Sequence, residues 1–369
     1  MTSCDVLIVG GGPAGSSCAW ALRASGLDIA LIDRQTFPRD KVCGGWITPR
    51  VLEALQIDPA DYRSGVMQPI TSFRTGYIGG NSPCDTDFGK PVSYGIRRLE
   101  FDGFLLRRAA DGERVRLREG VPLASLERSG EWWIANENLR ARLVVGAGGH
   151  FCPVARYLTG KHSEAPVVAQ ETEFEMDAQQ QAACRVRATC PELYFCSDMK
   201  GYGWCFRKGN VLNVGLGRAD SRSLREHVTG FVRFLHERAE VPAYLPPLRG
   251  HAYLLQGTSP RAIAGDGFLL VGDSAGLACP LSGEGILPAI ESGLLAAETI
   301  LAAKGDYSAA RLEPYREQIE PKLRGASHDW LSAMAGHLPA RLIGLAARPL
   351  TETGWFAREF ILRRWFLHA

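Results

Sequence analysis

The sequence predicts an α/β fold of the Rossmann type, into which a second domain with an antiparallel β-sheet is interleaved, followed by a C-terminal helical segment. Three observations predict it. A strand, a glycine-rich loop and a helix open the chain, and another strand ends in Gly272-Asp273 far downstream. Between them, residues 163–258 alternate apolar and polar side chains, as antiparallel strands do. The 369 residues suffice for two such domains.

The first unit is a nucleotide-binding motif. Residues 4–9 form an aliphatic run typical of a buried parallel strand, and Gly10-Gly11-Gly12-Pro13-Ala14-Gly15 matches G-x-G-x-x-G. An Ala-rich helix is expected over 16–25 and a second strand over 28–32. The glycines allow a tight turn, close approach of a pyrophosphate and close packing of helix on strand, while the helix N-terminus attracts phosphate. The complete unit predicts dinucleotide binding.

Asp33 stands at the end of the second strand. An acid at this distance from the glycines accepts hydrogen bonds from ribose hydroxyls. Its negative charge repels a 2′-phosphate, so the motif disfavours NADP in this pocket.

The downstream strand, residues 267–271, is followed by Asp273, which is placed to bind a polyol, and by the loop Pro280–Gly285. A helix is expected from about 287 to 303, so this loop offers backbone N–H groups at a helix N-terminus. Such groups favour negative charge, as on the N1–C2=O edge of a reduced flavin. A turn and a shaped loop without a ligand would be the alternative interpretation of these glycines alone.

Taken together, both ends resemble the p-hydroxybenzoate hydroxylase-like flavoprotein superfamily, and within it the geranylgeranyl reductase family. The matching motifs span most of residues 1–305: Pro38-x-x-Lys41-x-Cys43-Gly44-Gly45, Arg98-x-x-Phe101-Asp102-x-x-Leu105, Gly201-Tyr202-Gly203-Trp204-x-Phe206, Asn213-Val214-Gly215-x-Gly217, and the segment from Gly272 to Gly285. The resemblance implies an FAD-binding Rossmann-type domain and FAD as the cofactor.

The sequence departs from this family at four places. Ala147-Gly148-Gly149 lacks the aspartate of the family's Ala-Asp-Gly, and Arg156 has a shifted spacing. Trp46 replaces the third glycine after the cysteine, and Arg207 replaces a proline after Phe206. The last two changes are expected to alter the substrate pocket.

Tyr202, Trp204 and Phe206 are spaced by two, so they share one face of a strand. An aromatic wall suits an apolar ligand, whereas the spacing alone equally describes a packed core. The resemblance places this motif at the substrate pocket, and the predicted substrate-binding residues are Trp46, Tyr202, Trp204, Phe206 and Pro280.

Cys43 lies in a loop too rich in glycine for a core strand, and Lys41 nearby favours its thiolate. The resemblance implies that Cys43 lies beside the flavin with a catalytic role. A buried thiol that only packs between two backbones is the alternative. The predicted cofactor-binding residues are Gly10, Gly12, Pro13, Ala14, Gly15, Asp33, Arg34, Cys43, Gly44, Arg98, Val121, Gly148, Gly272, Asp273, Gly283, Gly285 and Ile286.

The remaining composition narrows the partners. A formal net charge of +2 gives no reason to expect nucleic acid, and the ten cysteines without a secretory signal are expected to be reduced thiols in the cytoplasm. Their spacing predicts no metal site. The segment 306–369 is expected to be helical with breaks at its prolines, among them Pro314 and Pro321. Its aromatic and arginine residues fit a cap over the substrate domain or a peripheral membrane contact.

The domain division follows from these motifs. We expect a discontinuous FAD-binding domain (1–69, 97–162 and 259–305), a substrate-binding domain (70–96 and 163–258) and the C-terminal helical segment (306–369).

The favoured activity is reduction of carbon–carbon double bonds in an apolar, isoprenoid-like substrate by hydride transfer from reduced FAD. An external donor, either NAD(P)H or a ferredoxin-like protein, is expected because no second dinucleotide motif is evident. A flavin monooxygenase on the same fold stays open, as does a flavin electron-transfer protein that turns over no small substrate.

Overall fold

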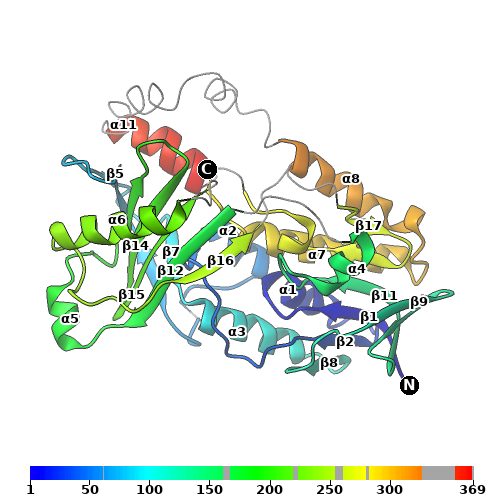
Figure 1. The fold of residues 1–369 in the computed structure, drawn as a ribbon. Coiled ribbons are helices and arrows are strands. Elements are labelled where there is room, and N and C mark those ends of the chain that lie inside the picture. Colours follow the sequence, from blue (N-terminus) through cyan, green and yellow to red (C-terminus); the bar gives the residue numbers. More distant parts are fainter. Residues whose placement is uncertain are drawn as a thin grey trace.

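The computed structural model describes residues 1–60, 62–160, 167–218, 223–253, 261–279, 282–325 and 354–367. Within them lie two large β-sheets, joined by a small three-stranded one. Figure 1 shows the first large sheet with helices α1, α3, α7 and α8 around it, and the second with α6 along one face.

The first large sheet carries the predicted Rossmann-type core. Its order is β17-β18-β11-β1-β2-β8, with β10 and β9 continuing beyond β11, and its central strands are parallel. The strands are β1 (Thr2–Val9), β2 (Ile29–Ile32), β8 (Val115–Arg118), β9 (Leu126–Ser129), β10 (Trp132–Ala135), β11 (Leu139–Gly146), β17 (Ala264–Gly265) and β18 (Phe268–Leu270).

Helices cover this sheet. They are α1 (Pro13–Leu22), α2 (Pro49–Leu55), α3 (Arg98–Ala110), α4 (Pro153–Thr159), α7 (Ile286–Ala303) and α8 (Ala309–Gly325), with a short 3₁₀ turn η1 (Gly272–Ala275). Helix α1 starts three residues earlier than expected, because Pro13 sits at its first position, where its missing N–H costs nothing.

Helix α7 packs against α1, α2 and α8. Among the described residues it is the one helix long and apolar enough, by length and composition, to cross a membrane. Most of it is buried inside the molecule, as in the core helix of a globular domain.

The predicted breaks at Pro314 and Pro321 are wrong, since α8 runs through both. Each proline removes one backbone donor, but Leu312, Tyr315 and Ile319 are almost fully buried. The Tyr315 hydroxyl also donates to the Leu270 carbonyl at 2.6 Å. Tertiary packing therefore holds the helix where local propensity would end it. The prolines at 339 and 349 lie outside the described residues.

The second large sheet has the order β16-β12-β15-β14-β13-β5-β6. Its pairs are antiparallel as expected, except that β13 pairs with β5 in parallel. The strands are β5 (Ser72–Tyr77), β6 (Cys84–Asp87), β12 (Val167–Glu175), β13 (Glu192–Phe195), β14 (Gly201–Lys208), β15 (Val211–Arg218) and β16 (Arg249–Tyr253).

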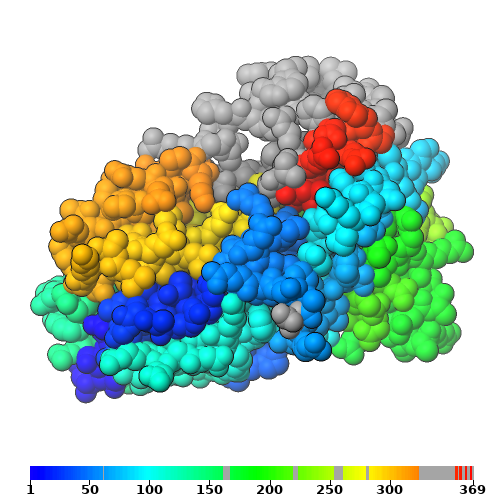
Figure 2. Space-filling model, turned by 180° about the vertical axis from the view of Figure 1, so that it is seen from behind, coloured from blue at the N-terminus to red at the C-terminus, as the bar shows by residue number. Residues whose placement is uncertain are grey.

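One face of this sheet packs on α6 (Leu224–Glu237), through a core that contains Leu212, Val214 and Phe231. A short helix α5 (Ala178–Ala183) follows β12. The other face is aromatic and also packs on the C-terminal helices α11 (Gly354–Phe356) and η3 (Ala357–Leu367), through Leu362, Phe366 and others. Figure 2 shows these red C-terminal residues against the light-blue segment of β6.

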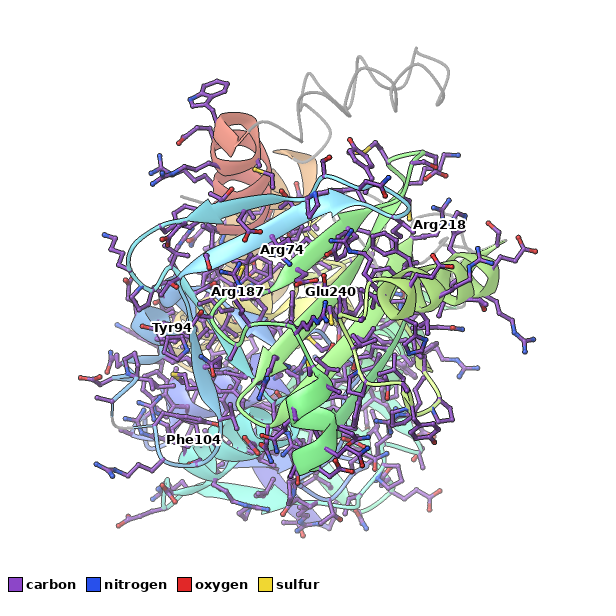
Figure 3. The ribbon with its side chains drawn as sticks, turned by 90° about the vertical axis from the view of Figure 1, so that its left-hand side faces the viewer. Arg74, Tyr94, Phe104, Arg187, Arg218 and Glu240 are labelled. Atoms are coloured by element: carbon purple, nitrogen blue, oxygen red, sulfur yellow. The ribbon has the colours of Figure 1, made fainter. Side chains whose placement is uncertain are left out.

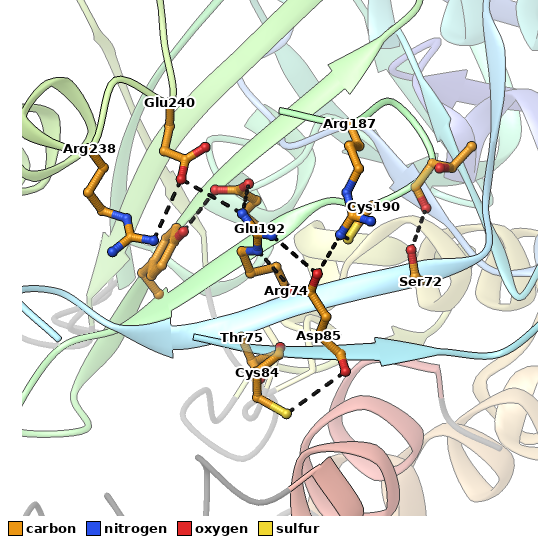
Figure 4. Close-up of polar contacts among 12 residues, drawn as sticks. Ser72, Arg74, Thr75, Cys84, Asp85, Arg187, Cys190, Glu192, Arg238 and Glu240 are labelled. Atoms are coloured by element: carbon orange, nitrogen blue, oxygen red, sulfur yellow. Dashed lines mark hydrogen bonds and ion pairs between the residues drawn. The ribbon is translucent and has the colours of Figure 1, made fainter. Parts of the chain in front are cut away.

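A charged cluster lies at the β5–β6 end of the second sheet. Figure 3 shows Arg74, Arg187 and Glu240 close together there, and Figure 4 shows their contacts. Arg74 forms ion pairs with Asp85 at 2.7 Å, Glu192 at 3.4 Å and Glu240 at 3.7 Å.

The small sheet, β3 (Trp46–Ile47), β7 (Ser93–Ile96) and β4 (Met67–Ile70), links the two large ones. Strand β3 pairs with β7, so residues from the predicted FAD-binding and substrate-binding ranges share this sheet.

Candidate active site

A cavity of about 470 Å³ runs between the two large sheets. Its walls come from the glycine-rich loop, the cysteine loop, the face of β14, the flavin-loop segment and the C-terminal helix. Most predicted site residues line it: Gly10, Gly12, Pro13, Ala14, Asp33, Arg34, Cys43, Gly44, Trp46, Arg98, Gly148, Tyr202, Trp204, Phe206, Asp273, Gly283, Gly285 and Ile286.

Three of the predicted residues that the structure describes are not on its wall. Gly15 lies behind the turn, where any Cβ would overlap the Gly10 carbonyl. Gly272 packs between α1 and α7, and a Cβ added to it would lie 3.1 Å from the Ala14 Cβ. The Val121 N–H donates to the Asp33 carbonyl at 2.8 Å, behind the cavity. Pro280 lies outside the described residues.

One end of the cavity suits a dinucleotide. Gly10 has φ +117°, and a Cβ there would overlap the Ala147 carbonyl, so only glycine fits. Asp33 accepts from the Gly11 N–H at 2.7 Å and from the Gln35 N–H at 2.8 Å, one on each carboxylate oxygen. Each oxygen keeps a lone pair for a ribose hydroxyl.

Two arginines lie beside the glycine-rich loop, held by one acid. Arg98 binds Asp102 through two bonds of 2.7 Å, and Arg39 approaches the same carboxylate at 3.0 Å. Burial alone would raise the pKa of Asp102, but the two arginines outweigh it and hold that pKa below its usual range. Two cations against one anion leave this cluster with a net positive charge.

The described residues give Arg39 Nη1 no hydrogen-bond partner, although it is buried. The neighbouring Arg39 Nη2 lies 3.6 Å from where a Cβ on Gly12 would be. A free donor beside a glycine at a helix N-terminus fits a bound phosphate. The spacing of the sequence motifs gives no sign of Arg39.

The other end of the cavity is aromatic because of strand register. Tyr202, Trp204 and Phe206 oppose Gly217, Gly215 and Asn213 on β15, so all point from one face. Trp46 adds a further ring, 5.9 Å from Phe206 and edge-on to it. The Tyr202 hydroxyl donates to the Ser282 carbonyl and ties this wall to the loop before α7.

Cys43 lies between the two ends and is half-buried. Its N–H donates to Glu171 Oε1 at 2.6 Å, and its sulfur accepts from the Gly45 N–H at 3.5 Å. Lys41 contacts His251 Nε2 at 2.8 Å, and it also interacts electrostatically with Cys43. Burial lowers the pKa of Lys41, and burial together with Lys41 lowers the pKa of His251 to about 3.

The comparisons with known proteins agree with this geometry. A family model described as FAD dependent oxidoreductase matches residues 5–66. The digeranylgeranylglycerophospholipid reductase 1 of Methanopyrus kandleri is 30% identical, over 87% of this chain and 87% of its own. The menaquinone reductase of Mycolicibacterium smegmatis is 30% identical, over 84% of this chain and 79% of its own. This chain belongs to the geranylgeranyl reductase family of FAD-dependent oxidoreductases.

A solved structure supports the fold of this family member. The geranylgeranyl bacteriochlorophyll reductase-like protein of Thermoplasma acidophilum has a TM-score of 0.81 at 22% identity, covering 98% of this chain and 96% of its own. This protein is therefore an oxidoreductase with FAD as its cofactor.

The residues present fit FAD. The Gly10–Gly12 cradle and the free Arg39 donor suit its pyrophosphate, and Asp33 suits its adenosine ribose. Asp273 lines the cavity beside Gly285, and its carboxylate suits the hydroxyls of a ribityl chain.

Among the lining residues that the sequence did not predict, His251 and Phe366 stand out besides Arg39. His251 on β16 lines it because its strand register sets it beside Ala169. Phe366 enters it from the C-terminal helix and stacks on Trp46. The aromatic and arginine residues of the tail fit a cap or a membrane contact, and they do not indicate which ring enters the cavity.

Proposed function

We propose that this protein reduces carbon–carbon double bonds of an apolar, isoprenoid-like substrate, using electrons carried by FAD. The observation that carries the proposal is the aromatic chamber at the cysteine-loop end of the cofactor cavity. An extended chamber of rings excludes water and suits a hydrocarbon chain better than a charged metabolite. The names of the relatives, a menaquinone reductase and a digeranylgeranylglycerophospholipid reductase, point to the same substrate class.

In this proposal, the glycine-rich loop with Arg39 and Arg98 binds the pyrophosphate, and Asp33 binds the ribose. The loop from Gly283 to Ile286 holds the electron-rich edge of the ring at the N-terminus of the 18-residue helix α7. These roles use the neutral N–H donors and the net positive charge described above.

The substrate chain would lie along Tyr202, Trp204 and Phe206, with Trp46 opposite. When bound and reduced, FAD supplies a hydride to one carbon of the double bond, and a proton completes the other carbon. The protein residues orient the alkene and exclude water and oxygen. Cys43, at the border between the cofactor and the chamber, is proposed to take part in this step.

Two further parts belong to the proposal. The electrons would come from an external donor, NAD(P)H or a ferredoxin-like protein. Delivery of a lipid substrate would involve a peripheral membrane contact at the C-terminal helices, where the Trp355 ring is 68% exposed and Arg363 is also exposed. Sedimentation of the protein with and without anionic vesicles tests this contact. If a Trp355→Ser variant sediments with the vesicles as well as the wild type does, the contact is rejected.

The activity itself is tested with a lipid and quinone extract. The chemically reduced protein is mixed with the extract without air, flavin reoxidation is followed, and the products are analysed by mass spectrometry. Anaerobic reoxidation with a product heavier by pairs of hydrogen supports the proposal. Oxygen insertion in an aerated sample, with no anaerobic reaction, would favour a monooxygenase, and reoxidation without any product would favour an electron carrier.

A further inference from the structure

Asn213 joins the aromatic wall to the cysteine loop. Its Oδ1 accepts from the Trp204 indole N–H at 2.7 Å, and its Nδ2 donates to the Cys43 carbonyl at 3.1 Å. The side chain is fully buried. Because one planar amide makes both bonds, it fixes the position of Trp204 relative to Cys43.

The cysteine loop is held from a second direction by a buried acid. Glu171, only 4% exposed, accepts the Cys43 N–H on one oxygen and the Asn213 Nδ2 on the other, at 2.6 and 3.1 Å. Burial raises the pKa of Glu171. Thus both backbone groups of Cys43, its N–H and its carbonyl, are held by this one polar network.

The network continues from Asn213 to the ion pair of Glu173 and Lys208. Asn213 Nδ2 also lies 3.1 Å from Glu173 Oε2, which accepts from Lys208 Nζ at 2.6 Å. Lys208 has no exposed surface. A buried lysine paired with an acid is costly to disturb, so it gives Asn213 a rigid base.

The packing explains why glycines flank this network. Gly215 lies opposite Trp204 across the strands, and a Cβ on Gly215 would overlap the indole ring. The missing side chain lets the ring lie flat on β15 and reach Asn213. On the loop side, a Cβ on Gly44 would come within 3.5 Å of the Trp204 nitrogen and 3.2 Å of the Phe206 ring.

We propose that Asn213 is a positioning residue, which keeps the Cys43 loop and the Trp204 wall at one spacing across the chamber while a substrate enters. In this proposal, the motif Asn213-Val214-Gly215 positions Trp204: Asn213 binds the indole N–H, and Gly215 leaves room for the ring. The effect of Asn213 on turnover rests on the proposed function. Its effect on the position of the Cys43 loop does not.

The first test replaces Asn213 by Asp. The carboxylate keeps the shape and the acceptor for Trp204, but it loses the donor to Cys43 and adds a third acid beside Glu171 and Glu173. Protonation of this cluster restores one donor, so the defect of Asn213→Asp should be large at about pH 8 and should shrink at about pH 5.5. A residue that only fills space would give no such recovery.

The matched control is Val214→Ala. Val214 is equally buried and adjacent, but it faces α6 on the other side of the sheet. Val214→Ala should lower stability without a pH-dependent effect on the site. A second variant, Asn213→Leu, removes the bonds of the amide to Trp204 and to Cys43 and leaves the Glu171–Cys43 and Lys208–Glu173 bonds in place.

Two readouts on the FAD-loaded enzyme decide the question. One is the rate of Cys43 alkylation by iodoacetamide, measured by peptide mass spectrometry. The other is the change in kcat compared with the change in KM, relative to the wild type. We expect alkylation to accelerate about tenfold in Asn213→Leu and in Asn213→Asp at high pH, with kcat falling more than KM rises. FAD affinity should stay at the wild-type value.

Alkylation rates equal to those of Val214→Ala at both pH values would overturn the inference. The alkylation readout needs no substrate. If the wild-type enzyme reduces no isoprenoid while the Asn213 variants still show the predicted alkylation rates, that result would reject the proposed function and support the positioning role.

Discussion

Phe366, close to the C-terminus, stacks on Trp46 with ring centroids 5.2 Å apart and planes 17° apart. Phe366 also meets Tyr202 edge-on at 5.3 Å. The C-terminal helix therefore closes one end of the aromatic chamber, and it does so against the residue that replaces a glycine of the family pattern.

This stack predicts the length of substrate that the chamber accepts. Trp46→Gly should open the closed end, so that KM falls for longer isoprenoid chains relative to shorter ones. The measurement compares reduction rates over a series of prenyl alcohols or their lipids. An unchanged length profile would mean that the substrate does not reach Trp46.

The same stack predicts a stability effect. Phe366→Ala should lower the free energy of unfolding by about 3–5 kcal/mol, since Phe366 is almost fully buried. Leu362→Ala is the control, because Leu362 is buried on the same helix but does not line the cavity. Both should lower the thermal midpoint, while only Phe366→Ala should change substrate affinity. Equal effects of the two on affinity would contradict a role for Phe366 in the chamber.

Asp33 should contribute strongly to FAD affinity. Asp33→Asn removes the charge that accepts from the Gly11 N–H, and FAD binding should weaken by about tenfold to a hundredfold. Titration of the apoprotein by flavin fluorescence measures this. Asp28→Asn, at a partly exposed acid paired with Arg114 just before the same strand, should bind FAD as the wild type does. If both variants bind equally well, Asp33 does not hold the ribose.

Cys43→Ser should lower turnover by about a hundredfold or more while FAD binding persists, if the thiol acts in the chemical step. Cys84→Ser, at a thiol near the remote charged cluster, serves as the control. Full turnover in Cys43→Ser would reduce Cys43 to a packing residue of the loop.

Glu192 predicts how stability depends on pH. Burial first, and then the nearby Glu240, raise the pKa of Glu192 to about 7, although the Tyr194 hydroxyl and the cations Arg74 and Arg238 oppose this. The folded state thus binds more protons than the unfolded chain between about pH 4.5 and pH 7, and stability falls as pH rises through this window, by at most ~1.4 kcal/mol per pH unit.

Glu192→Gln removes this titration and keeps an oxygen for the Tyr194 hydroxyl, which donates to Glu192 at 2.8 Å. The thermal midpoint of the variant, relative to the wild type, should therefore improve from pH 5 to about pH 7 and level off above it. A constant difference across this range would show that Glu192 is already ionised in the folded protein.

The sequence identified the parts of the site that depend on local chain geometry. The glycine-rich loop, Asp33 and the shared face of the β14 aromatics each follow from a short motif, although the spacing of the aromatics alone did not distinguish a ligand wall from a packed core. The run of central parallel strands was likewise evident from aliphatic segments ending in glycine or acid.

What sequence patterns left open depends on contacts between distant segments. Arg39 shares Asp102 with Arg98, and His251 meets Lys41, only because separate elements converge on one cavity. The sequence placed Lys41 near Cys43, but it gave no sign of the contact with His251. Similarly, Pro314 and Pro321 predicted breaks that the burial of α8 overrides.

The most direct test of the central claim uses a defined substrate. The holoenzyme is reduced chemically in D₂O without air and mixed with a geranylgeranyl-bearing lipid while flavin absorbance is recorded. The mass of the lipid is then measured by mass spectrometry. The account predicts flavin reoxidation and a product that gains one pair of deuterium atoms for each double bond reduced. A lipid of unchanged mass without air, together with a product that gains oxygen once air is admitted, would contradict it.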